Sequence, residues 1–204
     1  GLLEEIAGGG LPCPIGGQVP DFQPKKYVKP RKNIKVMSRD IQMGFVAADK
    51  AWTAAGVDPE AVDPERLGVI FGADLIAVEL NELIDVYRKC ITDGKFDFGR
   101  WGESAMSQMF PLWMLKYLPN MPACHVGIGR DARGPNDSLT LKEVSSLSAV
   151  IEAARVIQRG QADVMIAGGT SSRIHPTIWA RHKSDRMTAR IDEPAAACRP
   201  FDAQ

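Results

Sequence analysis

Residues 127–132 (GIGRDA) carry glycines at the spacing that dinucleotide-binding turns use. They match the pattern G-x-G-x-x-G/A, in which the backbone approaches a pyrophosphate at the N-terminus of the following helix. Gly134 and Pro135 prolong the turn, and helical periodicity returns only near Leu141. The stretch therefore favours a loop at the end of a strand over a nucleotide site.

Cysteine and histidine do not group for metal or nucleophilic chemistry. The sequence has no Cys-x-x-Cys pair and no histidine at zinc-ligand spacing. His125 is interpreted as a packed residue and His175, which precedes Pro176, as a turn residue, because neither has an evident partner that would make it a general base. We predict no metal and no cofactor. The residues concerned are Cys13, Cys90, Cys124, Cys198, His125, His175 and His182.

Apolar periodicity predicts the elements that must position any site. Ser38 is a candidate N-cap for a helix that ends at Gly56. Further helices are predicted over 80–91, 110–118 and 141–159, and buried strands over 67–72, 124–128 and 162–169. The last helix has an apolar face made of Leu147, Val150, Ile151, Ala154 and Ile157. This alternation requires a mainly parallel sheet between helices, so the fold class is α/β.

Composition excludes several classes of protein. The 204 residues include 25 basic and 25 acidic side chains, and 45% are hydrophobic, as in ordinary globular domains. Zero net charge argues against nucleic-acid or anionic-membrane partners. No apolar run reaches the roughly 18 residues of a membrane span, and the first residues lack the features of a secretory signal. We expect a soluble, cytoplasmic protein, with a Gly/Pro-rich irregular segment over 1–37 and a partial domain over 38–204.

The order of motifs along nearly the whole chain resembles the N-terminal half of the β-ketoacyl-[acyl-carrier-protein] synthases, type II in particular. The resembling pieces are residues 35–39 (KVMSR), 68–72 (GVIFG), 134–136 (GPN), 151–154 (IEAA) with Ile157, 160–169 (GQADVMIAGG) and 199–202 (RPFD). The resemblance implies half of a thiolase-like αβαβα domain and acyltransferase chemistry in fatty-acid or polyketide synthesis. It also implies an acyl carrier protein or acyl thioester as partner, and a homodimer or a heterodimer with a related synthase chain.

The chain departs from the family at the position of the nucleophile. After its Gly-Pro-Asn turn the family carries Thr-Ala-Cys-Ala, whereas residues 141–144 here read LKEV, which puts Glu143 where the resemblance implies the acyl-accepting cysteine. The family's catalytic histidines and lysine fall beyond residue 204. A carboxylate that attacked a thioester would give a mixed anhydride, a poor store for an acyl chain. We therefore predict a non-condensing member, with a chain-length-factor-like partner subunit or a malonyl-carrier decarboxylase as alternatives.

Two further interpretations stay open. Thr140 and Glu143 match the capping box S/T-x-x-E, so Glu143 could open a helix instead of contacting an acyl group or a carrier's prosthetic arm. Met106, Met109 and Phe110 are the candidate substrate-binding residues, because methionine and aromatic side chains suit an acyl pocket. The same spacing suits a core or dimer-interface helix, with Trp113 and Met114 continuing the apolar surface.

Overall fold

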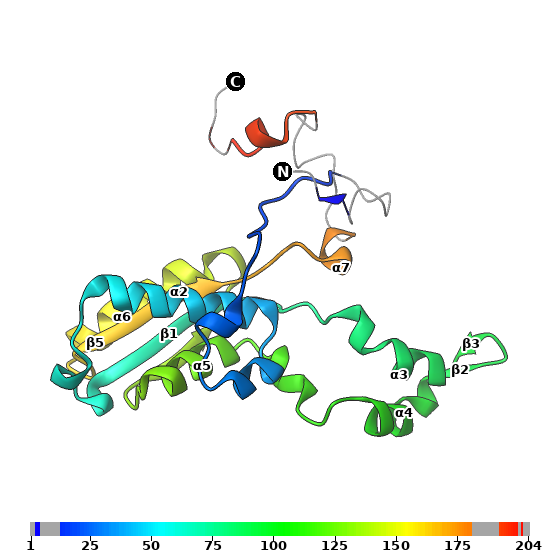
Figure 1. The fold of residues 1–204 in the computed structure, drawn as a ribbon, viewed down its shortest axis with the longest axis horizontal. Helices are drawn as coiled ribbons and strands as arrows, with labels where there is room; N and C mark the ends of the chain where they lie inside the picture. The colour runs from blue at the N-terminus through cyan, green and yellow to red at the C-terminus, as the bar shows by residue number, and fades with distance from the viewer. Residues whose placement is uncertain (1–2, 5–12, 181–191, 200, 202–204) are drawn as a thin grey trace. The chain divides into compact units, whose positions relative to one another are not determined.

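The computed structural model describes residues 3–4, 13–180, 192–199 and 201 (Figure 1). Its contacts divide the chain into two compact units, Gln23–Ser171 and a second unit made of Gly1–Phe22 with Ser172–Gln204. The larger unit contains the sheet and the position of Glu143. In the smaller unit, the indole of Trp179, in α7 (Pro176–Trp179), donates to the carbonyl of Cys13 at 3.2 Å. A short 3-10 turn, η10 (Pro194–Ala196), follows in the same unit.

The main sheet is parallel and has three described strands in the order β4, β1, β5. β1 (Leu67–Ala73) lies in the middle and is buried along its whole length. β4 (Asn136–Leu139) and β5 (Val164–Thr170) flank it, with Val69 opposite both Asn136 and Ile166. The predicted α/β class is confirmed, and so are the predicted strands at β1 and β5.

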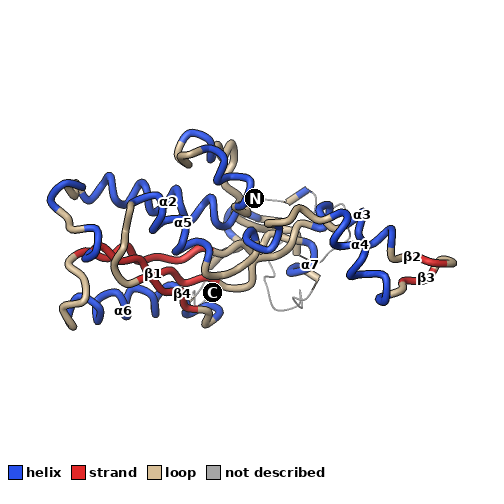
Figure 2. The backbone as a smooth tube through the Cα atoms, turned by 90° about the horizontal axis from the view of Figure 1, so that it is seen from below, coloured by secondary structure: helices blue, strands red, loops and turns tan. Residues whose placement is uncertain are grey.

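Helices cover both faces of this sheet (Figure 2). α2 (Arg39–Ala55) and α5 (Met121–Arg130) pack on one face, and α6 (Ser145–Gln158) packs on the other. α2 begins and ends as predicted, because the Ser38 hydroxyl accepts a hydrogen bond from the Ile41 amide and Gly56 adopts a left-handed conformation.

The predicted strand over 124–128 is wrong, because these residues belong to helix α5. Short apolar runs fit a buried helix as well as a buried strand. Here Ala123 and Val126 are buried three residues apart, as on one side of a helix, and Gly129 contacts the ring of Phe45, where an added Cβ would lie 2.6 Å from Cε2. The third strand is instead β4, which begins inside the predicted loop. Gly127 and Gly129 therefore lie within a helix, away from the strand-to-helix turn that a dinucleotide needs.

The connection from β1 to α5 differs from its prediction. A 3-10 turn, η5 (Leu80–Glu82), and α3 (Ile84–Lys89) occupy the predicted helix over 80–91. The hairpin of β2 (Ile91–Thr92) and β3 (Lys95–Phe96) follows, turning through Asp93 and Gly94, both at positive φ. The turn η6 (Phe98–Arg100) then leads into the next helix.

The predicted helix over 110–118 is wrong, because α4 (Trp101–Gln108) precedes that segment and only the turn η7 (Trp113–Lys116) lies within it. Tertiary contacts decide the helix position. The Ser104 hydroxyl donates to the Val86 carbonyl at 3.0 Å, and the Trp101 ring packs against Tyr87 with centroids 5.2 Å apart. These contacts hold α4 to α3.

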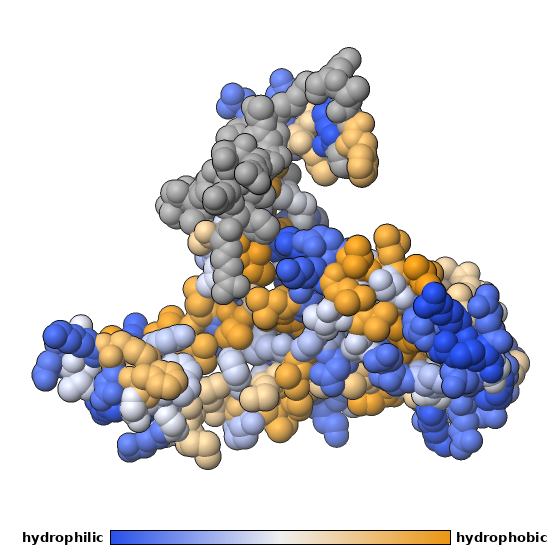
Figure 3. All heavy atoms as spheres, turned by 180° about the vertical axis from the view of Figure 1, so that it is seen from behind, coloured by the Kyte–Doolittle hydropathy of each residue, from blue (hydrophilic) through white to orange (hydrophobic). Residues whose placement is uncertain are grey.

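α6 contacts the sheet through small side chains and leaves its larger ones uncovered. Ala149, Ala153 and Val156 are buried against Ile70, together with the small Ala162. The predicted apolar face lies on the other side of the helix, and its members are exposed: Leu147, Val150, Ile151, Ala154 and Ile157. Figure 3 shows hydrophobic residues gathered on this side of the larger unit.

Residues 24–36 form two turns that pack on the sheet unit. They are η1 (Pro24–Lys26) and η2 (Arg31–Val36), and Val28 and Met37 beside them belong to the core that includes Ile41. The unit boundary therefore falls after Phe22, ahead of the boundary expected at residue 37. Among the described residues, no helix has the length and apolar character needed to cross a membrane.

Candidate functional site

The carboxyl ends of β1 and β4 form the candidate site. The chain leaves β1 toward α5 on one face of the sheet, and it leaves β4 toward α6 on the other face. Open α/β sheets bind ligands in the crevice outside two neighbouring strands that diverge in this way. Residues 140–144, which include Glu143, follow β4 at this edge.

Two glycines allow the first turn of α6 to lie directly on the strand ends. A Cβ added to Gly72 of β1 would lie 2.3 Å from the carbonyl carbon of Ser145. A Cβ added to Gly169 of β5 would lie 2.4 Å from the Cβ of Ser146. Any side chain at either strand position would therefore displace the helix start, and with it the turn that carries Glu143.

The turn before α6 is closed by a serine hydroxyl that the sequence analysis did not identify. The buried Ser145 accepts a hydrogen bond from the Leu141 amide and donates one to the Lys142 carbonyl, both at 2.7 Å. Lys142 adopts φ +55°, a conformation that is strained for a residue with a side chain. Strained backbone of this kind clusters at functional sites, because the surrounding structure must hold it.

α6 begins at Ser145, with Val144 as its N-cap residue and no side-chain capping bond. Thr140 and Glu143 therefore do not occupy the N-cap and N3 positions of this helix, and the predicted capping box is wrong for α6. Glu143 lies in the short turn η8 (Lys142–Val144) and is exposed. A carboxylate this close to a helix N-terminus is favoured by the helix dipole.

A second carboxyl group lies at the same end of the sheet, on the α2 face. Asp40 is in the first turn of α2, and the hydroxyl of Thr170, at the end of β5, donates to its backbone carbonyl at 2.8 Å. Burial raises the pKa of the Asp40 carboxyl to about 6, and the negative charge of Glu79 adds to the shift. Asp40 can therefore exchange a proton near neutral pH.

A cavity of about 400 Å³ lies between η2 and the connection from β1 to α5. Its lining combines two aromatic rings with four polar side chains: Phe110, Trp113, Lys35, Glu82, Gln108 and Lys116. Of the three candidate substrate residues, Phe110 lines this cavity. Met106 is 88% exposed and Met109 is half-buried, and neither contributes to the lining.

None of the described histidines, and not Cys124, belongs to the turn that carries Glu143. His125 is buried in α5, its Nε2 has no partner among the described residues, and burial lowers its pKa. His175 caps α7, where its Nδ1 accepts from the Thr177 amide. Cys124 is half-buried in α5, whereas His182 lies outside the described residues.

Comparison with known proteins identifies the family. The family description "Beta-ketoacyl synthase, N-terminal domain" matches residues 3–204. The chain is 32% identical to the actinorhodin polyketide beta-ketoacyl synthase 1 of Streptomyces coelicolor, over 94% of this chain and 40% of that protein. It is 26% identical to the 3-oxoacyl-[acyl-carrier-protein] synthase 2 of Staphylococcus aureus, over 92% of this chain and 43% of that protein.

Solved structures agree on the fold. A beta-ketoacyl synthase from Burkholderia phymatum superimposes with a TM-score of 0.64 and 25% identity, over 94% of this chain and 42% of that one. A type II polyketide ketosynthase in complex with its acyl-carrier protein superimposes with a TM-score of 0.62 and 20% identity, over 78% of this chain and 42% of that one. The chain thus spans less than half the length of these relatives. It belongs to the beta-ketoacyl synthase family and contains the N-terminal domain of that family's thiolase-like fold.

Proposed function

We propose that this chain is part of a β-ketoacyl synthase family protein of fatty-acid or polyketide biosynthesis that does not form an acyl-enzyme at position 143. The observation that carries the proposal is Glu143 itself, exposed in the turn between β4 and α6. The resemblance in motif order assigns this position to the acyl-accepting cysteine. Glycines at 72 and 169 and the Ser145 hydroxyl hold the turn in place without any contribution from a thiol.

The carboxylate of Glu143 is better suited to binding a ligand than to accepting an acyl group. A thiolate near a helix N-terminus is a strong nucleophile that stores an acyl group as a thioester. A carboxylate is a weaker nucleophile, and the anhydride that it would form is readily lost to water. Of the two alternatives, a chain-length-factor-like subunit needs only the fold. A decarboxylase would also need donors that stabilise an enolate, which the resemblance places in a C-terminal half.

Peptide mapping by mass spectrometry after incubation with an acyl thioester tests this proposal. We expect no acyl group on the peptide that contains Glu143, because its carboxylate does not accumulate an acyl product. The same chain denatured before incubation controls for acylation of Cys13, Cys90, Cys124 and Cys198. An acyl adduct mapped to Glu143 in the folded chain alone would contradict the proposal.

We also propose a dimer with a second synthase chain. β4 pairs with β1 on one side, and its other side carries no described strand. An open strand edge presents unpaired amides and carbonyls that another strand can satisfy. β4 immediately precedes the Glu143 turn, so a partner strand there would place a second chain beside the site. Both a homodimer and a heterodimer with a related synthase chain are consistent with this edge.

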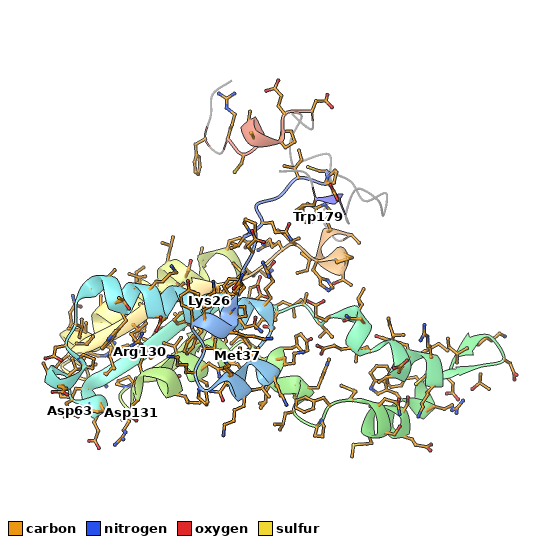
Figure 4. All side chains as sticks on the ribbon, in the orientation of Figure 1. Lys26, Met37, Asp63, Arg130, Asp131 and Trp179 are labelled. Atoms are coloured by element: carbon orange, nitrogen blue, oxygen red, sulfur yellow. The ribbon has the colours of Figure 1, made fainter. Side chains whose placement is uncertain are left out.

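A basic segment supports an acyl carrier protein as the other partner. Residues 25–35 contain six cations and no acidic residue, although the whole chain has zero net charge. All six are exposed, and none forms an ion pair with a described carboxylate: Lys25, Lys26, Lys29, Arg31, Lys32 and Lys35. Buried Val28 and Met37 anchor the segment (Figure 4 labels Lys26 and Met37). An anchored segment of exposed cations fits an acidic protein surface, and we assign this segment to carrier binding.

Charge reversal tests the assignment to the carrier. In the triple variant Lys25→Glu, Lys29→Glu, Lys32→Glu we expect binding of an acyl carrier protein to weaken by at least about tenfold at low salt, because complementary charges become repulsive. Surface plasmon resonance at two salt concentrations measures this loss. Lys89→Glu, an exposed change at the end of α3, is the control and should leave affinity unchanged. Equal affinity of the triple variant and the control would exclude the segment as the docking surface.

A further inference from the structure

We propose that the cavity between η2, η5 and η7 binds a small monocarboxylate with an apolar body. The proposal goes beyond the acyl thioester chemistry of the family and does not depend on Glu143. The volume of this cavity, about 400 Å³, falls within the range of volumes that small-ligand sites have. The lining brings together residues that are up to 81 positions apart, from Lys35 to Lys116.

The polar groups of the cavity leave one cation without a partner. Glu82 accepts hydrogen bonds on both carboxylate oxygens, one from the Lys116 ammonium and one from the Tyr117 hydroxyl at 2.9 Å. Burial, together with the hydrogen bond to Glu82, raises the pKa of Tyr117, so the phenol stays protonated and remains a donor. The charges of Glu82 and Lys116 therefore cancel within the lining.

Lys35 carries the remaining charge of the cavity lining. It comes from η2, is exposed, and forms no ion pair with any described carboxylate. The lining thus has one net positive charge, with Phe110 and Trp113 as its aromatic walls. A ligand that matches this lining has a single anionic group for Lys35 and an aliphatic or aromatic body for the two rings. A monocarboxylate with a hydrocarbon body meets both requirements.

Titration of the full chain with hexanoate and with hexanamide tests the proposal, because the two probes share an apolar body and differ in charge. The indole N–H resonance of Trp113, assigned with Trp113→Phe, reports binding at the cavity wall. We expect hexanoate to shift this resonance and to bind about five- to tenfold more tightly than hexanamide, as one partly exposed charged contact allows.

Matched lysine variants separate the cavity from general charge attraction. Lys35→Gln should remove the preference for hexanoate over hexanamide, and Lys29→Gln, in the same basic segment but outside the lining, should preserve it. Neither change touches the core, so both variants should fold. Equal affinity for the two probes, equal effects of the two variants, or no shift of the Trp113 resonance up to about 10 mM hexanoate would each overturn the proposal.

Discussion

In Glu143→Cys, position 143 should become reactive toward iodoacetamide and toward acyl thioesters, while the chain should still make no β-ketoacyl product. The new thiol would lie two residues before the first residue of α6. Thiol pKa values fall near helix N-termini, so a larger fraction of thiolate is expected than for a free cysteine, whose pKa is about 8.5. Peptide mapping after a short alkylation pulse measures this reactivity, and Glu143→Ala is the unreactive control.

Carbon–carbon bond formation needs further groups, which we expect to come from outside these residues. The donor must lose carbon dioxide, and positioned hydrogen-bond donors must stabilise the resulting enolate. The resemblance places those donors in a C-terminal half, and the chain spans less than half the length of its relatives. The measurement is release of labelled carbon dioxide together with β-ketoacyl product from malonyl- and acyl-carrier substrates. If the 204-residue variant alone made product, the groups that promote decarboxylation and stabilise the enolate would have to lie within this chain.

The exposed apolar face of α6 is consistent with catalytic groups that come from a C-terminal half of the domain. Leu147, Val150 and Ile151 are each more than half exposed, although the sequence pattern groups them as a helix face that needs burial. Apolar residues in one continuous stripe favour a second layer of structure on that side. We infer that the remainder of a full-length synthase domain packs there, opposite the sheet.

Sequence reasoning predicted the elements whose signals are local. The N-cap at Ser38 and the left-handed Gly56 bound α2, and apolar runs with adjacent glycines mark β1 and β5. It failed where local signals are ambiguous. The run at 124–128 is helical because Val126, with Ala123 and Gly129 on either side of it, packs against Phe45 and the rest of the core. That packing is a property of the folded molecule, which the run itself does not specify.

The site was only partly predictable, for the same reason. Motif order alone located Glu143. The contact of Gly72 with α6 depends on segments more than 70 residues apart meeting in space. The hydrogen bonds of the Ser145 hydroxyl are local, to Leu141 and Lys142, but they depend on the positive φ of Lys142, which no sequence motif marks. The basic segment had a clear signal in the sequence, namely six cations within residues 25–35. The zero net charge of the whole chain concealed it, because acidic residues elsewhere balance the total.

Gly72→Ala should destabilise the chain by about 3 kcal/mol, near the upper end of the usual cost of overpacking. The added Cβ would lie 2.3 Å from the Ser145 carbonyl carbon and 2.4 Å from the Ser146 amide nitrogen. These are backbone atoms, so a change of side-chain rotamer cannot relieve the overlap. The first turn of α6 would have to move away from β1, and its contact with Gly169 would be lost as well.

Gly102→Ala is the matched control, because it makes the same chemical change in the first turn of α4. Apart from the adjacent residues and the backbone of the helix itself, no atom lies within 4 Å of the new Cβ. It should stabilise the chain by up to about 1 kcal/mol, since alanine loses less backbone entropy than glycine in a helix. Urea unfolding with fitted midpoints and slopes measures both variants. In the Glu143→Cys background, Gly72→Ala should also slow alkylation of Cys at position 143, because the turn that presents the thiol depends on where α6 begins. If the Gly72 and Gly102 variants were equally stable, α6 could not lie directly on the end of β1, and the positioning assigned to Gly72 would be wrong.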